Sequence, residues 1–197
     1  MRISSFESEI CLPKGVDLIF PFFADARNLQ VLTPPWLEFQ MLTKGPILMH
    51  SGRLIDYRLR IRGIPLRWQT RIDVWDPPYR FVDSQLKGPY SFWRHEHLFV
   101  PERTGTRCID QVQYAVPGGP WVGRLLVRPD LERIFDFRRK KLKQLFPSLP
   151  GRLGEAIWPI FRVAHSLRIN SDMLVVRALE IGQMTDGGIP PTYDSMH

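Results

Sequence analysis

The chain has 197 residues, of which 44% are hydrophobic, so it has room for one domain of moderate size with a substantial core and not for several. Its formal net charge of +7 allows acidic partners, such as nucleic acid or anionic lipid, without requiring one. Because the two cysteines lack CxxC spacing and no segment resembles a signal peptide or a membrane-spanning helix, we expect a soluble, cytoplasmic protein without a redox or zinc motif.

The first segments predict a strand followed by two short helices. Residues 3–12 alternate loosely between apolar and polar side chains, as strands do. Residues 16–32 carry apolar side chains at helical spacing. Because Pro21 interrupts this run and Asp25 or Asn28 can cap a second helix, we expect two helices and not one.

The middle of the chain predicts six antiparallel strands. They cover residues 38–43, 52–62, 64–75, the two arms of a hairpin at 81–99, and 107–116. The predicted inward set of the strand 64–75 comprises Trp68, Thr70, Ile72 and Val74. Strands in hairpin series, with helices before and after them, indicate an α+β fold with an antiparallel sheet.

The hairpin at 81–99 has a mixed face. Side chains two positions apart share one side of a strand. The shared face therefore carries Phe81, Asp83, Gln85, Trp93, His95, His97 and Phe99. A three-residue loop at 88–90 sets Asp83 opposite His95 and Gln85 opposite Trp93. This face is apolar at its ends and polar in its middle, which is typical of a ligand pocket because unpartnered polar groups are costly in a plain core.

A long helix is predicted from about Pro129 to Phe146, and a short helix over 122–127 can precede it. Its apolar stripe comprises Leu131, Ile134, Phe135, Leu142, Leu145 and Phe146. The basic residues of 138–143 fall in its last turns, where cations suit the negative end of the helix, so we expect them to form a solvated face. The stripe must be buried, and the concave face of the sheet is its partner. The space left between helix and sheet is the predicted cavity.

Four segments, at 22–37, 52–72, 80–99 and 128–142, resemble the START/Bet v 1-like superfamily, also called SRPBCC, and within it the bacterial branch described as ligand-binding or polyketide cyclase/dehydrase-like. The resemblance covers about residues 1–146. It implies the helix-grip fold, in which a curved antiparallel sheet of about seven strands wraps a long C-terminal helix, with two short helices, and encloses a cavity. The superfamily includes lipid carriers, receptors and cyclases, so the resemblance does not identify a ligand. The iron-containing oxygenase branch is excluded because its Cys/His motif is missing.

Two functions follow from this resemblance and the hairpin. The first is binding, with transport or sequestration, of a hydrophobic or amphipathic small molecule. The second is a cyclase/dehydratase-type enzyme in which His95 or His97 carries protons and Asp83 is the partner that raises the pKa of His95. We expect no cofactor, and no metal because two histidines at i and i+2 lack a third ligand fixed in the sequence. The predicted ligand-binding residues are Tyr57, Trp68, Asp83, Gln85, Tyr90, Trp93, His95, His97, Phe99, Asp110, Tyr114 and Phe135.

Arginines at outward strand positions, 58, 60, 62, 67 and 71, could meet anionic lipid or RNA. No aromatic side chains are interleaved among them, so the stacking platform of a nucleic-acid binder is missing and we do not expect nucleic acid as a partner.

Residues 148–197 are predicted to be a C-terminal extension of the domain at 1–147. Its apolar runs at 155–168 and 173–181 must be buried somewhere. They can pack on the domain itself, on a second copy in a homodimer, or on a membrane surface. The tail after residue 186 is rich in Gly and Pro and is expected to be irregular.

Overall fold

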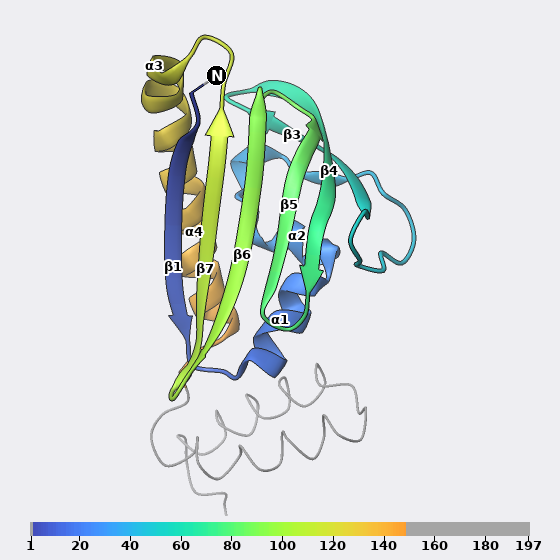
Figure 1. The fold of residues 1–197 in the computed structure, drawn as a ribbon, viewed down its shortest axis with the longest axis vertical. Coiled ribbons are helices and arrows are strands. Elements are labelled where there is room, and N and C mark those ends of the chain that lie inside the picture. Colours follow the sequence, from blue (N-terminus) through green and yellow to red (C-terminus); the bar gives the residue numbers. More distant parts are fainter. Residues whose placement is uncertain (1, 149–197) are drawn as a thin grey trace, which may run out of the picture. The chain divides into compact units, whose positions relative to one another are not determined.

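The computed structural model describes residues 2–148. The predicted apolar runs at 155–168 and 173–181 therefore lie outside the described residues. Within residues 2–148, seven strands form one sheet in the order β1-β7-β6-β5-β4-β3-β2, with every pair antiparallel (Figure 1). The strands are β1 Ser4–Leu12, β2 Gln40–Met41, β3 Leu54–Ile61, β4 Ile64–Asp76, β5 Arg80–Lys87, β6 Phe92–Glu102 and β7 Gly105–Ala115.

The helical elements fall into two groups, one after β1 and one after β7. The first group comprises α1 Val16–Ala24, the 3-10 turn η1 Ala26–Asn28, α2 Leu29–Leu32 and the 3-10 turn η2 Pro35–Leu37. The second comprises α3 Pro120–Val122, the π-helical turn η3 Gly123–Val127 and α4 Arg128–Leu145. None of the helices among residues 2–148 has the length and apolarity needed to cross a membrane.

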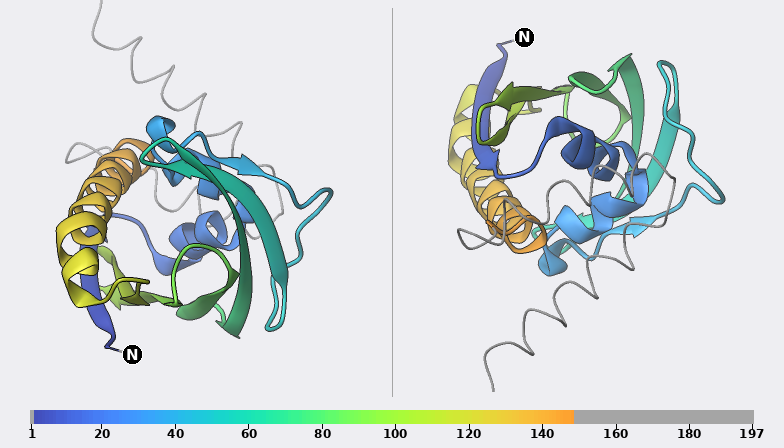
Figure 2. Two further views of the ribbon diagram at one scale, coloured as in Figure 1. Left: turned by 90° about the horizontal axis from the view of Figure 1, so that it is seen from above. Right: turned by 90° about the horizontal axis from the view of Figure 1, so that it is seen from below.

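The sheet curves around α4. Seen from above, β1 and β7 lie beside α4, while β3 and β4 lie across from it and the first helical group closes one end (Figure 2). The buried residues of α4 are Leu131, Phe135, Arg138 and Leu142, which recur at helical spacing on one side. Leu142 joins the aromatic core under α1, and Phe135 packs on Phe6 of β1. The predicted α+β helix-grip fold is confirmed.

The break between the first two helices lies at Asp25, and the predicted interruption at Pro21 is wrong. Pro21 lies inside α1, where a missing N–H removes one hydrogen bond without ending the helix. Asp25 is in an extended conformation and its side chain accepts a hydrogen bond from the N–H of Arg27. The carboxylate therefore caps η1, as short acidic side chains do.

The prediction that Val74 faces inward is also wrong. The register between β4 and β5 shifts between Ile72 and Val74, which is a β-bulge. Beyond the bulge, Val74 pairs with Val82 on the other face, and Trp75 takes the inward position against Phe81. A one-residue shift exchanges the faces of every later side chain, and periodicity alone cannot show where it occurs.

Candidate functional site

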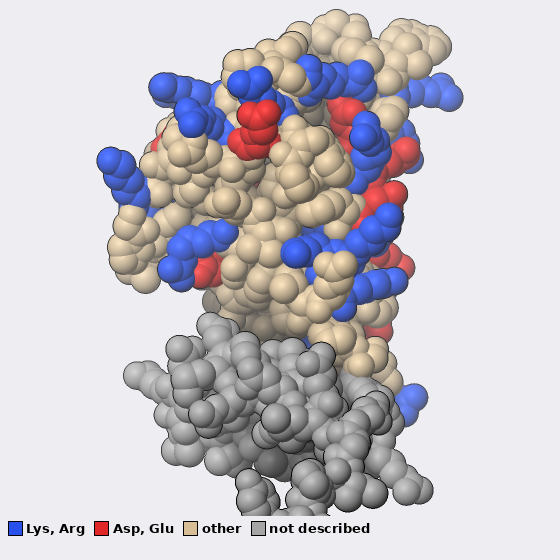
Figure 3. Space-filling view, turned by 180° about the vertical axis from the view of Figure 1, so that it is seen from behind, with Lys and Arg blue, Asp and Glu red and all other residues tan. Residues whose placement is uncertain are grey.

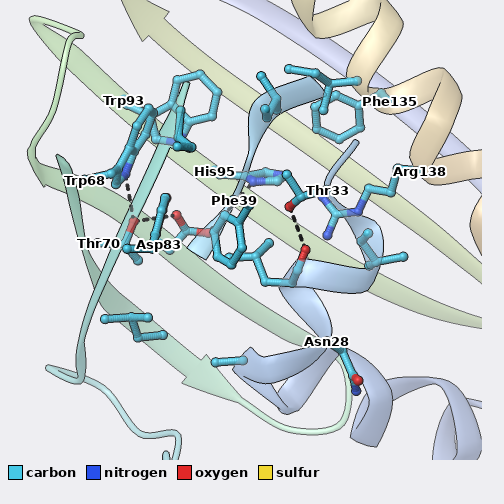
Figure 4. Close-up of a pocket in the computed structure, with 18 of the residues that line it drawn as sticks. Asn28, Thr33, Phe39, Trp68, Thr70, Asp83, Trp93, His95, Phe135 and Arg138 are labelled. Atoms are coloured by element: carbon cyan, nitrogen blue, oxygen red, sulfur yellow. Dashed lines mark hydrogen bonds and ion pairs between the residues drawn. The ribbon is translucent and has the colours of Figure 1, made fainter. Parts of the chain in front are cut away.

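A cavity of about 460 Å³ lies between the concave face of the sheet, α4 and the first helical group. This volume falls in the range of roughly 300–1,000 Å³ that small-molecule sites occupy. Eight of the predicted ligand-binding residues line it: Tyr57, Trp68, Asp83, Tyr90, Trp93, His95, His97 and Phe135. Figure 4 labels Trp68, Asp83, Trp93, His95 and Phe135 among them. Their contact with a ligand stays a prediction.

Four of the predicted residues do not line the cavity. Phe99 and Tyr114 are fully packed in the core, where they contact other aromatic side chains. Asp110 lies behind the two histidines. Gln85 is not opposite Trp93, because the pairing of β5 with β6 ends at Ser84; its amide bonds the backbone of Tyr90 in a loop one residue longer than predicted.

Aromatic rings form the cavity wall on the side of β3, β4 and the β5–β6 loop. Tyr57 and Trp68 are stacked with 5.9 Å between ring centroids, and the edge of Trp93 meets Trp68 at 5.4 Å. Tyr90 lies 4.7 Å from Trp93. Such offset and edge-on contacts hold the rings in place. The result is a broad, apolar surface that suits an apolar or flat ligand.

An ion pair between the β3–β4 turn and α4 contributes to the cavity wall. Nε of Arg62 lies 2.8 Å from a carboxylate oxygen of Asp130, and Arg62 also donates to the carbonyl of Leu126. Arg62 has φ +51°, in the left-handed region. Beside this pair, the guanidinium of Arg133 lies over the ring of Trp36, at 5.5 Å from its centroid.

A group of five charged or titratable side chains, here called the polar cluster, lies at the cavity wall, and all of its members except Asp110 line the cavity. It comprises Asp83 of β5, His95 and His97 of β6, Asp110 of β7 and Arg138 of α4. The strand registers bring it together, since Asp83 is opposite His95 and His97 is opposite Asp110. The predicted register of the hairpin is confirmed at Asp83.

Both imidazoles lie between two carboxylates. Asp110 Oδ1 is 3.0 Å from His95 Nε2 and 2.8 Å from His97 Nδ1, although the second contact is not aligned as a hydrogen bond. On the cavity side, Asp83 Oδ2 is 3.3 Å from His97 Nε2 and 3.9 Å from His95 Nδ1. Asp83 is therefore closer to His97 than to His95, which it faces in the register.

The surroundings shift the two imidazole pKa values in opposite directions. Burial, together with the neighbouring His97, lowers the pKa of His95. Burial also acts to lower the pKa of His97, but contacts with Asp110 and Asp83 outweigh it and raise the pKa. Asp83 acts to raise the pKa of His95, as expected, but burial outweighs both carboxylates at that ring, so the net shift is downward.

Asp110 is the ionised centre of the cluster. Its burial would raise the pKa of its carboxyl group, yet Arg138 and the two imidazoles hold that pKa well below its ordinary value. At the edge of the cluster, Trp68 donates to Thr70, whose hydroxyl is 3.5 Å from Asp83.

Sequence reasoning missed Arg138, which we expected to be solvated with the rest of the basic run. The residue is only 9% exposed and lines the cavity. A signal was present, because position 138 lies three residues after Phe135 and four before Leu142 and so falls on the buried stripe of α4. The five outward arginines of the strands, by contrast, are exposed, and three of them form ion pairs with acids. Lys and Arg outnumber Asp and Glu on the face in Figure 3.

Asp83, His95 and His97 are the described residues that could hold a metal ion. One ligand atom from each lies within 4.8 Å of the others. Two imidazoles and a carboxylate suit a transition metal in chemistry. In the structure the same atoms contact one another, and the guanidinium of Arg138 adds a positive charge close by. Acid–base chemistry and ligand orientation are also within the capacity of this group.

Comparison with known structures defines the class of protein. The chain is similar to Ara h 8.0201, with 13% identity and a TM-score of 0.54 over 74% of this chain and 98% of that one. It is also similar to the Zhui aromatase/cyclase from Streptomyces sp. R1128, with 16% identity and a TM-score of 0.57 over 72% of this chain and 92% of that one. A third similar structure is the major latex-like protein 151 from Panax ginseng, with 8% identity and a TM-score of 0.56 over 74% of this chain and 99% of that one. These likenesses show a Bet v 1-like fold.

Residues 12–142 match the family model described as polyketide cyclase / dehydrase and lipid transport. The match covers more than half of the chain, so the protein belongs to this family. A comparison with curated protein sequences found no match. Family and fold together support a hydrophobic ligand-binding protein of the SRPBCC superfamily, without identifying a substrate.

Proposed function

We propose that this protein binds a hydrophobic or amphipathic small molecule in the cavity between the sheet and α4, and carries or sequesters it. The observation that supports this most is the composition of the cavity wall, which is mostly apolar, is rich in aromatic side chains and carries the polar cluster. A mostly apolar pocket with a few convergent polar groups is typical of a ligand site. The apolar wall would hold the body of the ligand, and the cluster would orient its polar end.

A second candidate is catalysis of the cyclase/dehydratase type. It is favoured by one observation, the adjacent imidazoles with pKa values shifted in opposite directions on the cavity wall. Two titratable groups whose surroundings separate their pKa values can act as acid and base. His95 and His97 would then carry protons to and from the bound compound, with Asp83 and Asp110 as their partners.

A panel of lipids and polyketide-like aromatic compounds, followed by thermal shift and by mass spectrometry of the incubated compounds, tests both candidates. A variant with His95→Gln and His97→Gln should still bind if the protein is a carrier, and should lose turnover if it is an enzyme. Ile134→Trp fills the cavity from α4 and should weaken binding of every ligand. Leu145→Trp, on the same helix but not on the cavity wall, is its control. Failure of every compound to bind the wild-type protein would contradict both candidates.

A further inference from the structure

The guanidinium of Arg138 has hydrogen-bond donors that no described residue accepts. Arg138 makes no side-chain hydrogen bond within residues 2–148, and its Nε is a fully buried donor without a partner. The nearest acid is Asp110, whose Oδ1 is 3.6 Å from Nη1, longer than a hydrogen bond. Because arginine stays charged and burying unpaired donors costs free energy, an acceptor inside the cavity would stabilise this guanidinium.

Two phenyl rings hold the guanidinium in place. Its central carbon lies 5.7 Å from the ring centroid of Phe23 and 5.6 Å from that of Phe135. These cation–π contacts stabilise the charge without using the N–H groups. In Figure 4, Arg138 reaches from α4 toward Thr33 and His95, and all three residues line the cavity. The hydroxyl of Thr33 donates to the carbonyl of Leu29, and no hydrogen bond joins it to Arg138.

The other acids near Arg138 are occupied. Asp110 is shared by the two imidazoles, and Asp83 contacts His97 and Thr70. No oxygen of residues 2–148 accepts a hydrogen bond from Arg138, which leaves the guanidinium available to an acceptor in the cavity that it lines. A carboxylate fits best, since its two oxygens match the planar fork of a guanidinium.

We propose that the ligand of this cavity is an apolar carboxylic acid, with its carboxylate bound by Arg138 and its body against the aromatic wall. The proposal rests on the function proposed above and names the class of compound for the same site. It also assigns Arg138 as the residue that selects an acid over a neutral compound of the same shape.

Matched pairs of compounds test the proposal at pH 7 and low salt. The pairs are 1-pyrenebutyric acid with 1-pyrenebutanol, followed by fluorescence, and dodecanoic acid with dodecanol, followed by calorimetry. A charge-assisted pair contributes roughly 1.5–3 kcal/mol. Of the two acids, the one that binds the wild-type protein more tightly should therefore bind at least about tenfold more tightly than its matched alcohol. The pyrene and dodecyl arms distinguish a flat aromatic body from an aliphatic one.

Substitutions identify the residue responsible. Arg138→Met should remove the preference for the acid while binding of the alcohol changes less than about twofold. Arg138→Lys keeps the positive charge but loses the planar guanidinium that can donate two parallel hydrogen bonds, so it should retain part of the preference for the acid. Arg103→Met is the charge-matched control, because Arg103 is exposed and away from the cavity, and it should keep the full preference.

Two results would overturn the proposal. Equal binding of acid and alcohol by the wild-type protein would do so without any variant, and so would an undiminished preference in Arg138→Met. In either case binding of the alcohol leaves the function proposed above intact. If none of the four compounds, nor any of the wider panel, binds the wild-type protein, both proposals fail together.

Discussion

The imidazole rings of His95 and His97 lie 3.8 Å apart between centroids, and both approach the same oxygen of Asp110. Two rings this close do not both carry a proton without repulsion, so the pair titrates as a unit. One proton is favoured by the two carboxylates, and a second is opposed by burial and by the first. This coupling, on the wall of an apolar cavity, governs the electrostatics of the site.

The first prediction concerns the two proton affinities. In an NMR titration of labelled histidines, one cluster imidazole should titrate above 6.5, the ordinary pKa of a histidine, and the other below it. The single variants His95→Gln and His97→Gln assign the signals. Because His97 lowers the pKa of His95, His95 should titrate higher in the His97→Gln variant than it does in the pair. Two normal titrations near 6.5 would show that the rings are neither coupled nor buried.

The second prediction is a stability maximum. The raised pKa of His97 gives stability that is present below 6.5 and is lost as the pH rises through the folded-state pKa. The lowered pKa of His95 removes stability as the pH falls below 6.5, because the unfolded chain takes up that proton first. The difference in unfolding free energy between the wild type and the double His→Gln variant should therefore peak near pH 6.5. Urea unfolding between pH 5 and 9 measures it, and a flat difference would contradict the coupling.

The third prediction concerns Asp110. Asp110→Asn removes the carboxylate that lies among Arg138 and the two imidazoles, and leaves a buried cation without its counter-charge. We expect a loss of about 3–5 kcal/mol in unfolding free energy at pH 7. The loss should be smaller in an Arg138→Met background, since the two charges are coupled. Asp17→Asn, an exposed acid in the first turn of α1, should change stability by less than about 0.5 kcal/mol. Additive effects of the two cluster substitutions would show that Asp110 and Arg138 do not interact.

The fourth prediction concerns metal ions. Because Arg138 places a positive charge beside the candidate ligands and Asp83 already contacts His97, Zn²⁺ should raise the melting temperature of the wild-type protein by less than about 1 °C at tenfold excess. Arg138→Met removes the nearby cation and should bind Zn²⁺ more tightly than the wild type does. A large, concentration-dependent stabilisation of the wild type that disappears in the double His→Gln variant would instead identify a metal site at Asp83, His95 and His97.

Much of the fold was predictable because strand and helix periods are local properties of the sequence. The face of the hairpin that carries Asp83, His95 and His97 followed from alternation alone. Alternation did not predict that Trp75 faces inward in place of Val74, because a bulge depends on how β4 pairs with β5. The ending of the β5–β6 pairing before Gln85 depends likewise on the conformation of the loop.

The polar cluster could be predicted only in part. The sequence places the two histidines on one face. It does not show that Asp110 contacts both rings, because those contacts depend on the distances between β6 and β7. Burial then decides the direction of the pKa of His95, and depth in a fold is not visible in a short motif. Arg138 was hidden within a basic run, where its position on the apolar stripe was the only sign of its burial.

The central claim is that the cavity holds a small apolar molecule. Native mass spectrometry of the full chain purified from its own host, followed by extraction of any bound compound, tests this most directly. We predict an added mass of one organic molecule, carrying a carboxyl group, that is absent from Ile134→Trp and present in Leu145→Trp. Repeated wild-type preparations without added mass, together with no thermal shift from any compound of the panel, would contradict the claim.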